Sequence, residues 1–278
     1  MVDLHAAPGK QNNDAHAGTS DRANFFGDKH NQNCTIRVLK SLVEAIIRIG
    51  TDNIVGIELL NEPHPPSDNV LQKWYTEAIC AVRSLNLSIP IYISDCWHLD
   101  AYAEFISHHA SSGPLVLDHH LYRCFTSSDI HTSVQDLSRS LSDPSASFPQ
   151  ALARAVEKIG RAGAGVVIGE WSAALNPGSL GGVPNEQMEF VKAQLSLYER
   201  LCAGWFFWTY QKEGCLDTGW SFRNAVDRGI FPTPVGIRKR NTVHSEHERL
   251  RRHAAYEKAQ NDAYSELVRL PFEMYINT

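Results

Sequence analysis

The sequence predicts an α/β fold in which helices cover a parallel sheet or barrel. Residues 54–60 and 165–170 are apolar runs rich in β-branched residues, as expected of strands that are buried on both faces. The first run leads to Asn61 and Glu62 immediately before a proline, and the second ends in Glu170. A proline cannot continue a hydrogen-bonded ladder, so these polar side chains lie at strand tips, where parallel α/β folds bind ligands.

Each of the other elements follows from its own local pattern. Residues 2–5 form the first strand and lead into a polar loop over residues 8–28, whose length is typical of functional loops. A helix is predicted at 31–50, because Ile36, Leu39, Val43, Ile46 and Ile47 recur on one face and Gly50 ends it. After strand 54–60, a helix at 69–85 begins at a Ser-Asp cap and turns Val70, Trp74, Ile79 and Val82 inward.

The second half of the chain repeats this alternation. Strands are predicted at 89–95, 114–119, 165–170 and 203–210, and helices at 99–109, 149–162 and 185–202. Residues 126–149 are predicted to be a loop with a short helical piece, and residues 210–222 a further loop. Trp97 and His98 follow a strand tip, where pocket lining and rim packing both remain open for them.

Two carboxylates at strand ends can face each other across a pocket. Glycoside hydrolysis uses such a pair, with one carboxyl group as proton donor and the other as nucleophile or base. Either glutamate alone would more simply be a capping or salt-bridged residue. Together, at two strand tips, Glu62 and Glu170 favour catalysis.

These motifs resemble glycoside hydrolase family 5, most closely its fungal exo-β-1,3-glucanase branch. The resemblance rests on Asn61-Glu62-Pro63 and Glu170-Trp171. It extends to residues 3–12, 118–122 and 204–210, which look like the third, sixth and eighth strands of that family's barrel. The similarity runs from residue 2 to about residue 237.

The resemblance implies a (β/α)8 TIM barrel, here N-terminally truncated to about six of eight βα units because the chain opens on strand three. We expect this glycoside hydrolase barrel to occupy residues 1–237 and a charged C-terminal helical extension, residues 238–278, to pack on it. The family has an arginine at the end of strand two that supports the nucleophile, and that strand is missing here. An incomplete barrel has two unpaired edges and an open core, so we expect poor stability.

The resemblance also implies a role for each site residue. Glu62 is the general acid/base, with a pKa raised by burial and by the neighbouring carboxylate, and Glu170 is the nucleophile of a retaining reaction. Tyr122 hydrogen-bonds Glu170, and His120 lies near the acid/base; the two share a strand face because strand periodicity is two. The substrate-binding residues are expected to be His5, Asn12, Asn61, His120, Tyr122, Phe125, Trp208 and Trp220. Among these, Asn61 holds the sugar 2-hydroxyl, Trp208 floors the −1 subsite and Phe125 is an aromatic platform.

Composition limits the classes of partner. The net charge of −5 and pI of about 6.2 give no bulk attraction to nucleic acid or anionic membrane, whereas a neutral β-glucan or β-glucoside suits such a surface. There is no apolar run long enough to span a membrane. The six cysteines include no C-x-x-C pair, so they are predicted to be buried free thiols rather than metal or redox motifs. No metal and no cofactor are expected.

Other readings stay open alongside a β-1,3-glucan hydrolase. The chain could be a catalytically impaired remnant that only binds glycans, or a β-glucosidase for glucosylated lipids or sterols. The alternative of a metal-dependent isomerase barrel has weak support, because His5, Glu62 and Glu170 lack metal-ligand spacing. The family implies an extracellular or cell wall location, with the cytoplasm as the alternative for a chain without a signal peptide, and a monomer if the barrel is complete.

Overall fold

The computed structural model describes residues 1–50, 53–213 and 216–232 of the 278-residue chain. The chain divides into two units, Met1–Pro232 and Thr233–Thr278. The C-terminal extension predicted at 238–278 therefore lies outside the described residues, as does Cys215. Everything below concerns the first unit.

Six parallel strands form a single sheet in chain order, β1-β2-β3-β4-β5-β6. They are β1 (Val2–Asp3), β2 (Ile57–Glu58), β3 (Ile91–Ser94), β4 (Leu115–Leu121), β5 (Gly165–Trp171) and β6 (Gly204–Phe207). Sequential parallel order is the arrangement of a (β/α)8 barrel, so the predicted fold class is confirmed. Within the described residues β1 and β6 do not pair with each other, and the sheet is open between them.

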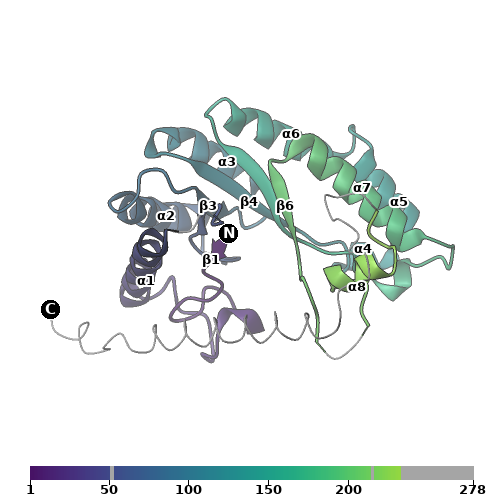
Figure 1. Ribbon diagram of the computed structural model, residues 1–278, viewed down its shortest axis with the longest axis horizontal. Coiled ribbons are helices and arrows are strands. Elements are labelled where there is room, and N and C mark those ends of the chain that lie inside the picture. Colours follow the sequence, from purple (N-terminus) through teal and green to yellow (C-terminus); the bar gives the residue numbers. More distant parts are fainter. Residues whose placement is uncertain (51–52, 214–215, 233–278) are drawn as a thin grey trace. The chain divides into compact units, whose positions relative to one another are not determined.

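Helices connect the strands and follow one another along one face of the curved sheet (Figure 1). The five that were predicted are α1 (Lys29–Ile49), α2 (Asp68–Arg83), α3 (Leu99–His108), α6 (Ser147–Gly160) and α7 (Glu186–Leu201). The described residues also form three short helices: α4 (Ser127–His131), α5 (Val134–Ser142) and α8 (Phe222–Asp227). Single 3-10 turns occur at Ala15–Ala17, Ala110–Ser112 and Pro177–Ser179. No helix in this part of the chain is long and apolar enough to cross a membrane.

The predicted inner faces of the first two helices are only partly right. In α1, Leu39 and Val43 are fully buried, but Ile47 is 49% exposed. The inner face is completed instead by Gln32, whose amide donates to the carbonyl of Phe25. Val70 in α2 is likewise exposed. A polar side chain that satisfies a backbone carbonyl can therefore be buried on the inner face of a helix, where hydropathy alone does not identify it.

Strands β1 and β2 are shorter than predicted, at two residues each. The backbone leaves the regular ladder at Gly56, whose φ is +153°, and again at Glu62, whose φ is +39°. Pairing nonetheless continues beyond the strands, because Leu4 N donates to the carbonyl of Glu58 and Asn61 N donates to that of Leu4, at 3.1 Å. The strand tips that carry the polar residues are thus still tied together.

The loop predicted at 126–149 is largely helical, which corrects that assignment. It contains α4, α5 and the start of α6. A capping box begins α4: the hydroxyl of Thr126 accepts from Asp129 N, and the Asp129 carboxylate accepts from Thr126 N. Helix α8 is also additional to the prediction and is capped by Ser221. Short capped helices rich in Ser and Asp are easily taken for loops, since their apolar stripe is too short to show a period.

The cysteine prediction is half right. Cys34, Cys80, Cys96, Cys124 and Cys202 are free thiols, as expected. They are not fully buried, because Cys80 is exposed and the other four are partly exposed.

A close approach next to Glu170 requires a glycine. Strand β5 skips one residue in its pairing with β4, so that His119 lies opposite Ile168 and His120 opposite Glu170. The skipped residue is Gly169, and a Cβ on it would lie 2.0–2.3 Å from the carboxylate atoms of Asp118. The carboxylate of Asp118 thus fills the space that a side chain at position 169 would need.

Gly169→Ala is expected to destabilise the fold by about 1–3 kcal/mol, the usual cost of overpacking a buried site. Gly204→Ala is the matched control, because a Cβ there has no neighbour within 4 Å and φ is not in the left-handed region. Urea unfolding of both variants measures the difference. Equal unfolding midpoints would show that the Asp118 side chain can move to accommodate the added methyl group.

Candidate active site

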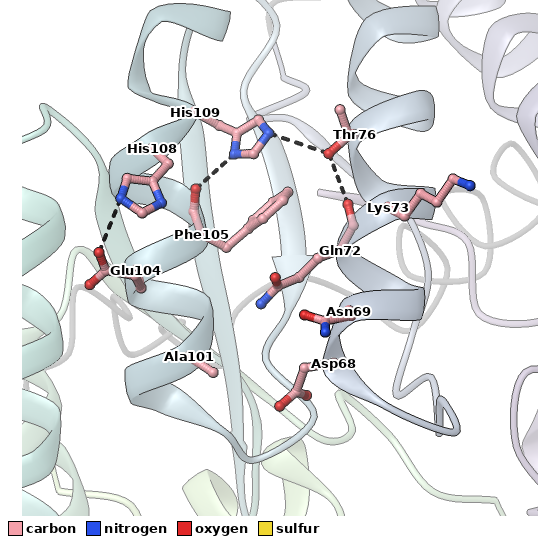
Figure 2. Close-up of a pocket in the computed structure, with 10 residues that line it drawn as sticks. All are labelled: Asp68, Asn69, Gln72, Lys73, Thr76, Ala101, Glu104, Phe105, His108 and His109. Carbon is pink, nitrogen blue, oxygen red and sulfur yellow. Dashed lines mark hydrogen bonds and ion pairs between the residues drawn. The ribbon is translucent and has the colours of Figure 1, made fainter.

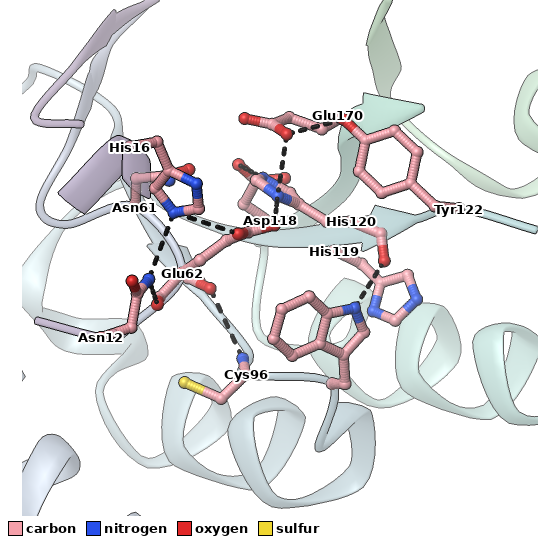
Figure 3. A network of polar contacts seen from close by, with 12 residues as sticks. Asn12, His16, Asn61, Glu62, Cys96, Asp118, His119, His120, Tyr122 and Glu170 are labelled. Atoms are coloured by element: carbon pink, nitrogen blue, oxygen red, sulfur yellow. Dashed lines mark hydrogen bonds and ion pairs between the residues drawn. The ribbon is translucent and has the colours of Figure 1, made fainter. Parts of the chain in front are cut away.

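Glu62 is held at the tip of β2 by the loop over residues 8–28. The amide of Asn12 donates to the backbone carbonyl of Glu62 at 2.8 Å, and the amide of Gln11 donates to that of Asn61 at 3.0 Å. The Glu62 side chain then reaches two imidazoles: Oε1 lies 2.7 Å from His120 Nδ1, and Oε2 lies 3.5 Å from His16 Nε2 (Figure 3). The loop therefore fixes the position of the first glutamate.

Glu170 lies opposite, near the end of β5. The hydroxyl of Tyr122 donates to Glu170 Oε2 at 2.7 Å, the hydrogen bond that the family resemblance implied. His120 Nδ1 lies 3.5 Å from the same oxygen. One oxygen of Glu62, one of Glu170 and a His120 ring nitrogen all lie within 4.8 Å of one another. The two strand-end carboxylates are therefore brought together around a single imidazole.

His120 is positioned to carry a proton on both ring nitrogens. Its Nδ1 faces Glu62 and Glu170, and its Nε2 lies 3.4 Å from Asp118 Oδ2. Only the imidazolium form presents hydrogen atoms on both sides. Burial disfavours that charge, but the negative charges of Asp118 and Glu170 and the hydrogen bond to Glu62 outweigh it, so the pKa of His120 is raised well above its ordinary value of 6.5.

The predicted rise in the pKa of Glu62 is wrong. Burial does act to raise it, but the hydrogen bond and charge of His120, with smaller contributions from His16 and His64, lower the pKa below its ordinary value. For Glu170 the balance is reversed: burial raises the pKa, and His120 and Tyr122 offset this only in part. In the free site the proton near the glutamates thus lies on His120.

His5 and Trp208 form a second part of the site. Their rings stack with centroids 5.3 Å apart and an interplanar angle of 3°. His5 Nδ1 lies 2.7 Å from Asp3 Oδ2, and this hydrogen bond raises the pKa of His5 despite partial burial. Trp208 remains 41% exposed. It therefore has ring surface available for a sugar, as the role predicted for it requires.

Three aromatic side chains gather beside Glu170, one of which is the Tyr122 that donates to it. The ring centroid of Tyr122 lies 5.5 Å from that of Phe125 and 5.6 Å from that of Trp220, and Phe125 lies 5.7 Å from Trp220. Phe125 is 66% exposed, whereas the other two are partly buried. The structure thus joins Phe125 and Trp220, far apart in sequence, to the tyrosine that contacts Glu170.

The two predicted asparagine contacts differ. Asn12 is buried and bonded to Glu62, to the ring nitrogen of His16 at 3.2 Å and to Asp14 N, so here it supports the loop rather than facing a pocket. Asn61 is also buried, but its side-chain nitrogen has no hydrogen-bond partner within the described part of the chain. An unused donor beside Glu62 suits an acceptor on a ligand.

The sequence left pocket lining and rim packing open for Trp97 and His98, and the structure gives the two residues different surroundings. The indole nitrogen of Trp97 donates to the backbone carbonyl of His120 at 3.0 Å, so this tryptophan belongs to the site. His98 instead pairs with Asp68 on α2, at 2.9 Å. It takes no part in the site.

Three sets of side chains in and below the site carry nitrogen and oxygen atoms of the kinds that bind metal ions. The sets Asp14, His16 and Glu62; Glu58, Asp118 and His120; and Glu62, His120 and Glu170 each lie within 4.8 Å. Two of them depend on His120, whose nitrogens both face carboxylates; in the imidazolium form each nitrogen carries a proton, so neither has a lone pair for a metal. The donor chemistry of the described residues therefore favours proton transfer over metal binding.

A surface groove of about 620 Å³ lies between α2 and α3 (Figure 2). Its histidines bond to other lining residues: His109 Nε2 lies 3.3 Å from Thr76 Oγ1, and His108 Nε2 lies 3.1 Å from Glu104. Neither Glu62 nor Glu170 lines it. The groove therefore offers no catalytic pair.

Three acidic or basic neighbours of the glutamates were not singled out as site residues from the sequence. Asp118 and Glu58 are fully buried beneath His120, and His16 contacts Glu62 from the loop. Strand alternation could have indicated Asp118, because it lies two residues before His120 on the same face. No periodic pattern marks His16, which lies in an irregular loop.

Comparison with known proteins decides the family. The model of the cellulase family, glycosyl hydrolase family 5, matches residues 1–214. The chain belongs to glycosyl hydrolase family 5. The resemblance read from the strand-end motifs is thereby confirmed.

Fungal relatives share most of this family 5 chain. It is 31% identical over 239 residues to glucan 1,3-beta-glucosidase 3 of Schizosaccharomyces pombe, covering 84% of this chain and 48% of that protein. It is 28% identical to the probable glucan 1,3-beta-glucosidase A of Aspergillus terreus, covering 86% of this chain and 63% of that protein. The chain therefore spans about half to two thirds of the length of these relatives.

Solved structures agree with the fold. A rutinosidase from Aspergillus niger superposes with a TM-score of 0.63 and 20% identity, over 83% of this chain and 66% of that one. The structure called AoRut gives a TM-score of 0.65, also at 20% identity, over 83% of this chain and 65% of that one. At this identity the likeness concerns the fold alone.

Proposed function

We propose that this chain carries the active site of a retaining β-glucoside hydrolase that acts on β-1,3-glucan or a related β-glucoside. The observation that carries the proposal is the separation of the two glutamates, whose nearest oxygens lie within 4.8 Å. Retaining enzymes place their carboxyl groups about 5–5.5 Å apart, whereas inverting enzymes need about 6.5–9.5 Å to admit a water. The short distance supports double displacement.

In the first step, the Glu170 carboxylate attacks the anomeric carbon while Glu62 protonates the departing glycosidic oxygen. The tyrosine hydroxyl 2.7 Å from Glu170 favours its ionised form. Because the pKa of Glu62 is lowered, the departing proton starts on His120 Nδ1 and passes to Glu62 along their 2.7 Å hydrogen bond. Charge developing on the leaving oxygen draws this proton across.

In the second step, water replaces the leaving group. Glu62 takes a proton from that water, the water oxygen attacks the anomeric carbon, and the bond to Glu170 breaks. The proton on Glu62 returns to His120 and restores the starting state. Two inversions at the anomeric carbon give net retention.

The surrounding side chains support a glucosyl substrate. The exposed face of Trp208 matches the apolar C–H face of a β-glucosyl ring, and the unpaired amide nitrogen of Asn61 is placed to hold a sugar hydroxyl beside Glu62. The cluster of Tyr122, Phe125 and Trp220 offers a second aromatic surface. The names of the fungal relatives support a β-glucan substrate. An extracellular or cell wall location, which the family resemblance implies, stays part of the proposal.

The function is tested with the full chain, an aryl β-glucoside and a β-1,3-glucan oligomer. Proton NMR during the first minutes should show β-glucose before mutarotation produces the α-anomer. Initial release of α-glucose would refute retention. Calorimetric binding of the oligomer without hydrolysis of either substrate would instead favour the glycan-binding remnant, for which the open edges of β1 and β6 in the described residues are the supporting observation.

A further inference from the structure

A pair of buried carboxyl groups lies on the side of His120 away from the glutamates. Asp118 on β4 and Glu58 on β2 are 0% and 1% exposed. One oxygen of each lies within 4.8 Å of the other and of a His120 nitrogen. The mechanism proposed above uses neither of them.

Two carboxylates this close and this deeply buried cannot both be ionised without a large cost. Burial, followed by the charges of Asp118 and Asp3, raises the pKa of Glu58 well above 4.5. His120 Nε2 lies 3.4 Å from Asp118 Oδ2, whereas Glu58 forms no ion pair with a described residue. Of the two carboxyl groups, Asp118 is the one whose negative charge the imidazolium of His120 would stabilise directly.

We propose that Asp118 is a positioning residue that keeps the proton on His120 and aims its Nδ1 at Glu62, while Glu58 and Asp118 share a second proton beneath it. The inference rests on the proposed function, since it identifies the residue that keeps a proton on His120, from which Glu62 receives it. The resulting order is a neutral Glu58, an ionised Asp118, a charged His120 and an ionised Glu62.

The backbone fixes this arrangement. Asp118 and His120 lie two residues apart on β4, and the missing side chain of Gly169 on β5 leaves the space that the Asp118 carboxylate fills. The ionisable groups that face His120 are Asp118 on its own strand, Glu58 and Glu62 from β2 and its tip, and Glu170 from β5. Of these, Asp118 alone contacts Nε2 in the described residues.

The adjacent pair Asp95 and His119 provides a matched control. His119 Nδ1 lies 2.7 Å from Asp95 Oδ2, and both residues are buried, but His119 stacks on Phe148 instead of facing the glutamates. Asp95→Asn removes a carboxylate from a buried imidazole in the same way as Asp118→Asn. It keeps Oδ1, which accepts from Trp97 N at 2.9 Å.

The experiment is an NMR pH titration of the full chain labelled with 15N-histidine and free of substrate. The His120 signals are identified by their loss in His120→Gln. In the wild type, His120 should remain imidazolium at pH values above 6.5. Asp118→Asn should lower its titration midpoint by about 1–3 pH units, the usual effect of an opposite charge at this distance, whereas Asp95→Asn should leave it in place.

A third variant tests the shared proton. If Glu58 is neutral, Glu58→Gln replaces one uncharged hydrogen-bond donor with another, and the midpoint of His120 should stay within about half a unit of the wild type. If Glu58 is ionised, its removal takes away a negative neighbour and the midpoint should fall. That fall would overturn the proton-sharing half of the proposal.

Failure of this proposal can be told apart from failure of the proposed function. A wild-type His120 that is neutral at or below pH 6.5 overturns the proposal, and this measurement needs neither a folded variant nor turnover. An equal shift in Asp118→Asn and Asp95→Asn also overturns it. Where turnover is present, Asp118→Asn should lower kcat at the alkaline end of the pH profile for glucan oligomers, with KM unchanged. Absent turnover with the expected titration refutes only the hydrolase.

Discussion

Glu170→Gln is expected to reduce turnover of every β-glucoside by about a thousandfold or more, whatever the leaving group. An amide oxygen is a poor nucleophile, and the covalent intermediate cannot form without the carboxylate. The amide can still accept the hydrogen bond from Tyr122, so the fold and the affinity for substrate should change little. Initial rates with an aryl β-glucoside and with a glucan oligomer, alongside calorimetric binding, measure this.

Glu186→Gln is the matched control. Glu186 is a buried glutamate that accepts hydrogen bonds from Gly181 N, Gly182 N and Gln135 at the start of α7, and neither Glu62 nor Glu170 is among these partners. It is expected to keep turnover even if it lowers thermal stability. Substantial activity in Glu170→Gln would show that another group attacks the anomeric carbon.

Glu62→Ala is expected to discriminate between leaving groups. Glucan oligomers, whose departing alkoxide needs a proton, should lose about 10²–10⁴-fold in rate, the usual contribution of a general acid. Aryl glucosides that form stable phenolates need no proton in the first step and should form the glycosyl-enzyme at a rate closer to that of the wild type. Pre-steady-state release of the phenol is the measurement, since removing the base also slows the second step.

Azide provides the decisive product. It is an anionic nucleophile that needs no general base, so it should accelerate the second step of Glu62→Ala and yield β-glucosyl azide. In Glu170→Gln, azide would displace the leaving group directly and give the α-product. An α-azide from Glu62→Ala would mean that the roles of the two glutamates are assigned the wrong way round.

The pair itself could be predicted from sequence because two local signals coincide. Apolar β-branched runs locate the buried strands, and the polar residues after them must then occupy the strand tips. The spacing of His120 and Tyr122 likewise follows from the two-residue period of a strand. These inferences need no knowledge of what packs opposite, and the resulting strand order is confirmed.

What could not be predicted depends on contacts across the chain. The pKa of Glu62 falls because His120, 58 positions later, lies 2.7 Å away. Asn12 is buried, and its amide donates a hydrogen bond to the backbone carbonyl of Glu62. The positive φ of Glu62 and the skipped pairing at Gly169 also occur where strands meet. No residue pattern in the sequence predicts either of them.

One imidazole nitrogen lies within 3.5 Å of both glutamates, and this changes what a pH profile can report. Removing a proton from any member of the cluster alters the affinity of the others for theirs, so the protons leave in steps that belong to the whole assembly. The two apparent pKa values read from a bell-shaped rate profile would then be macroscopic values that belong to Glu62, His120 and Glu170 jointly. Replacing one member should move both limbs together, as in a polyprotic acid, instead of deleting one and sparing the other.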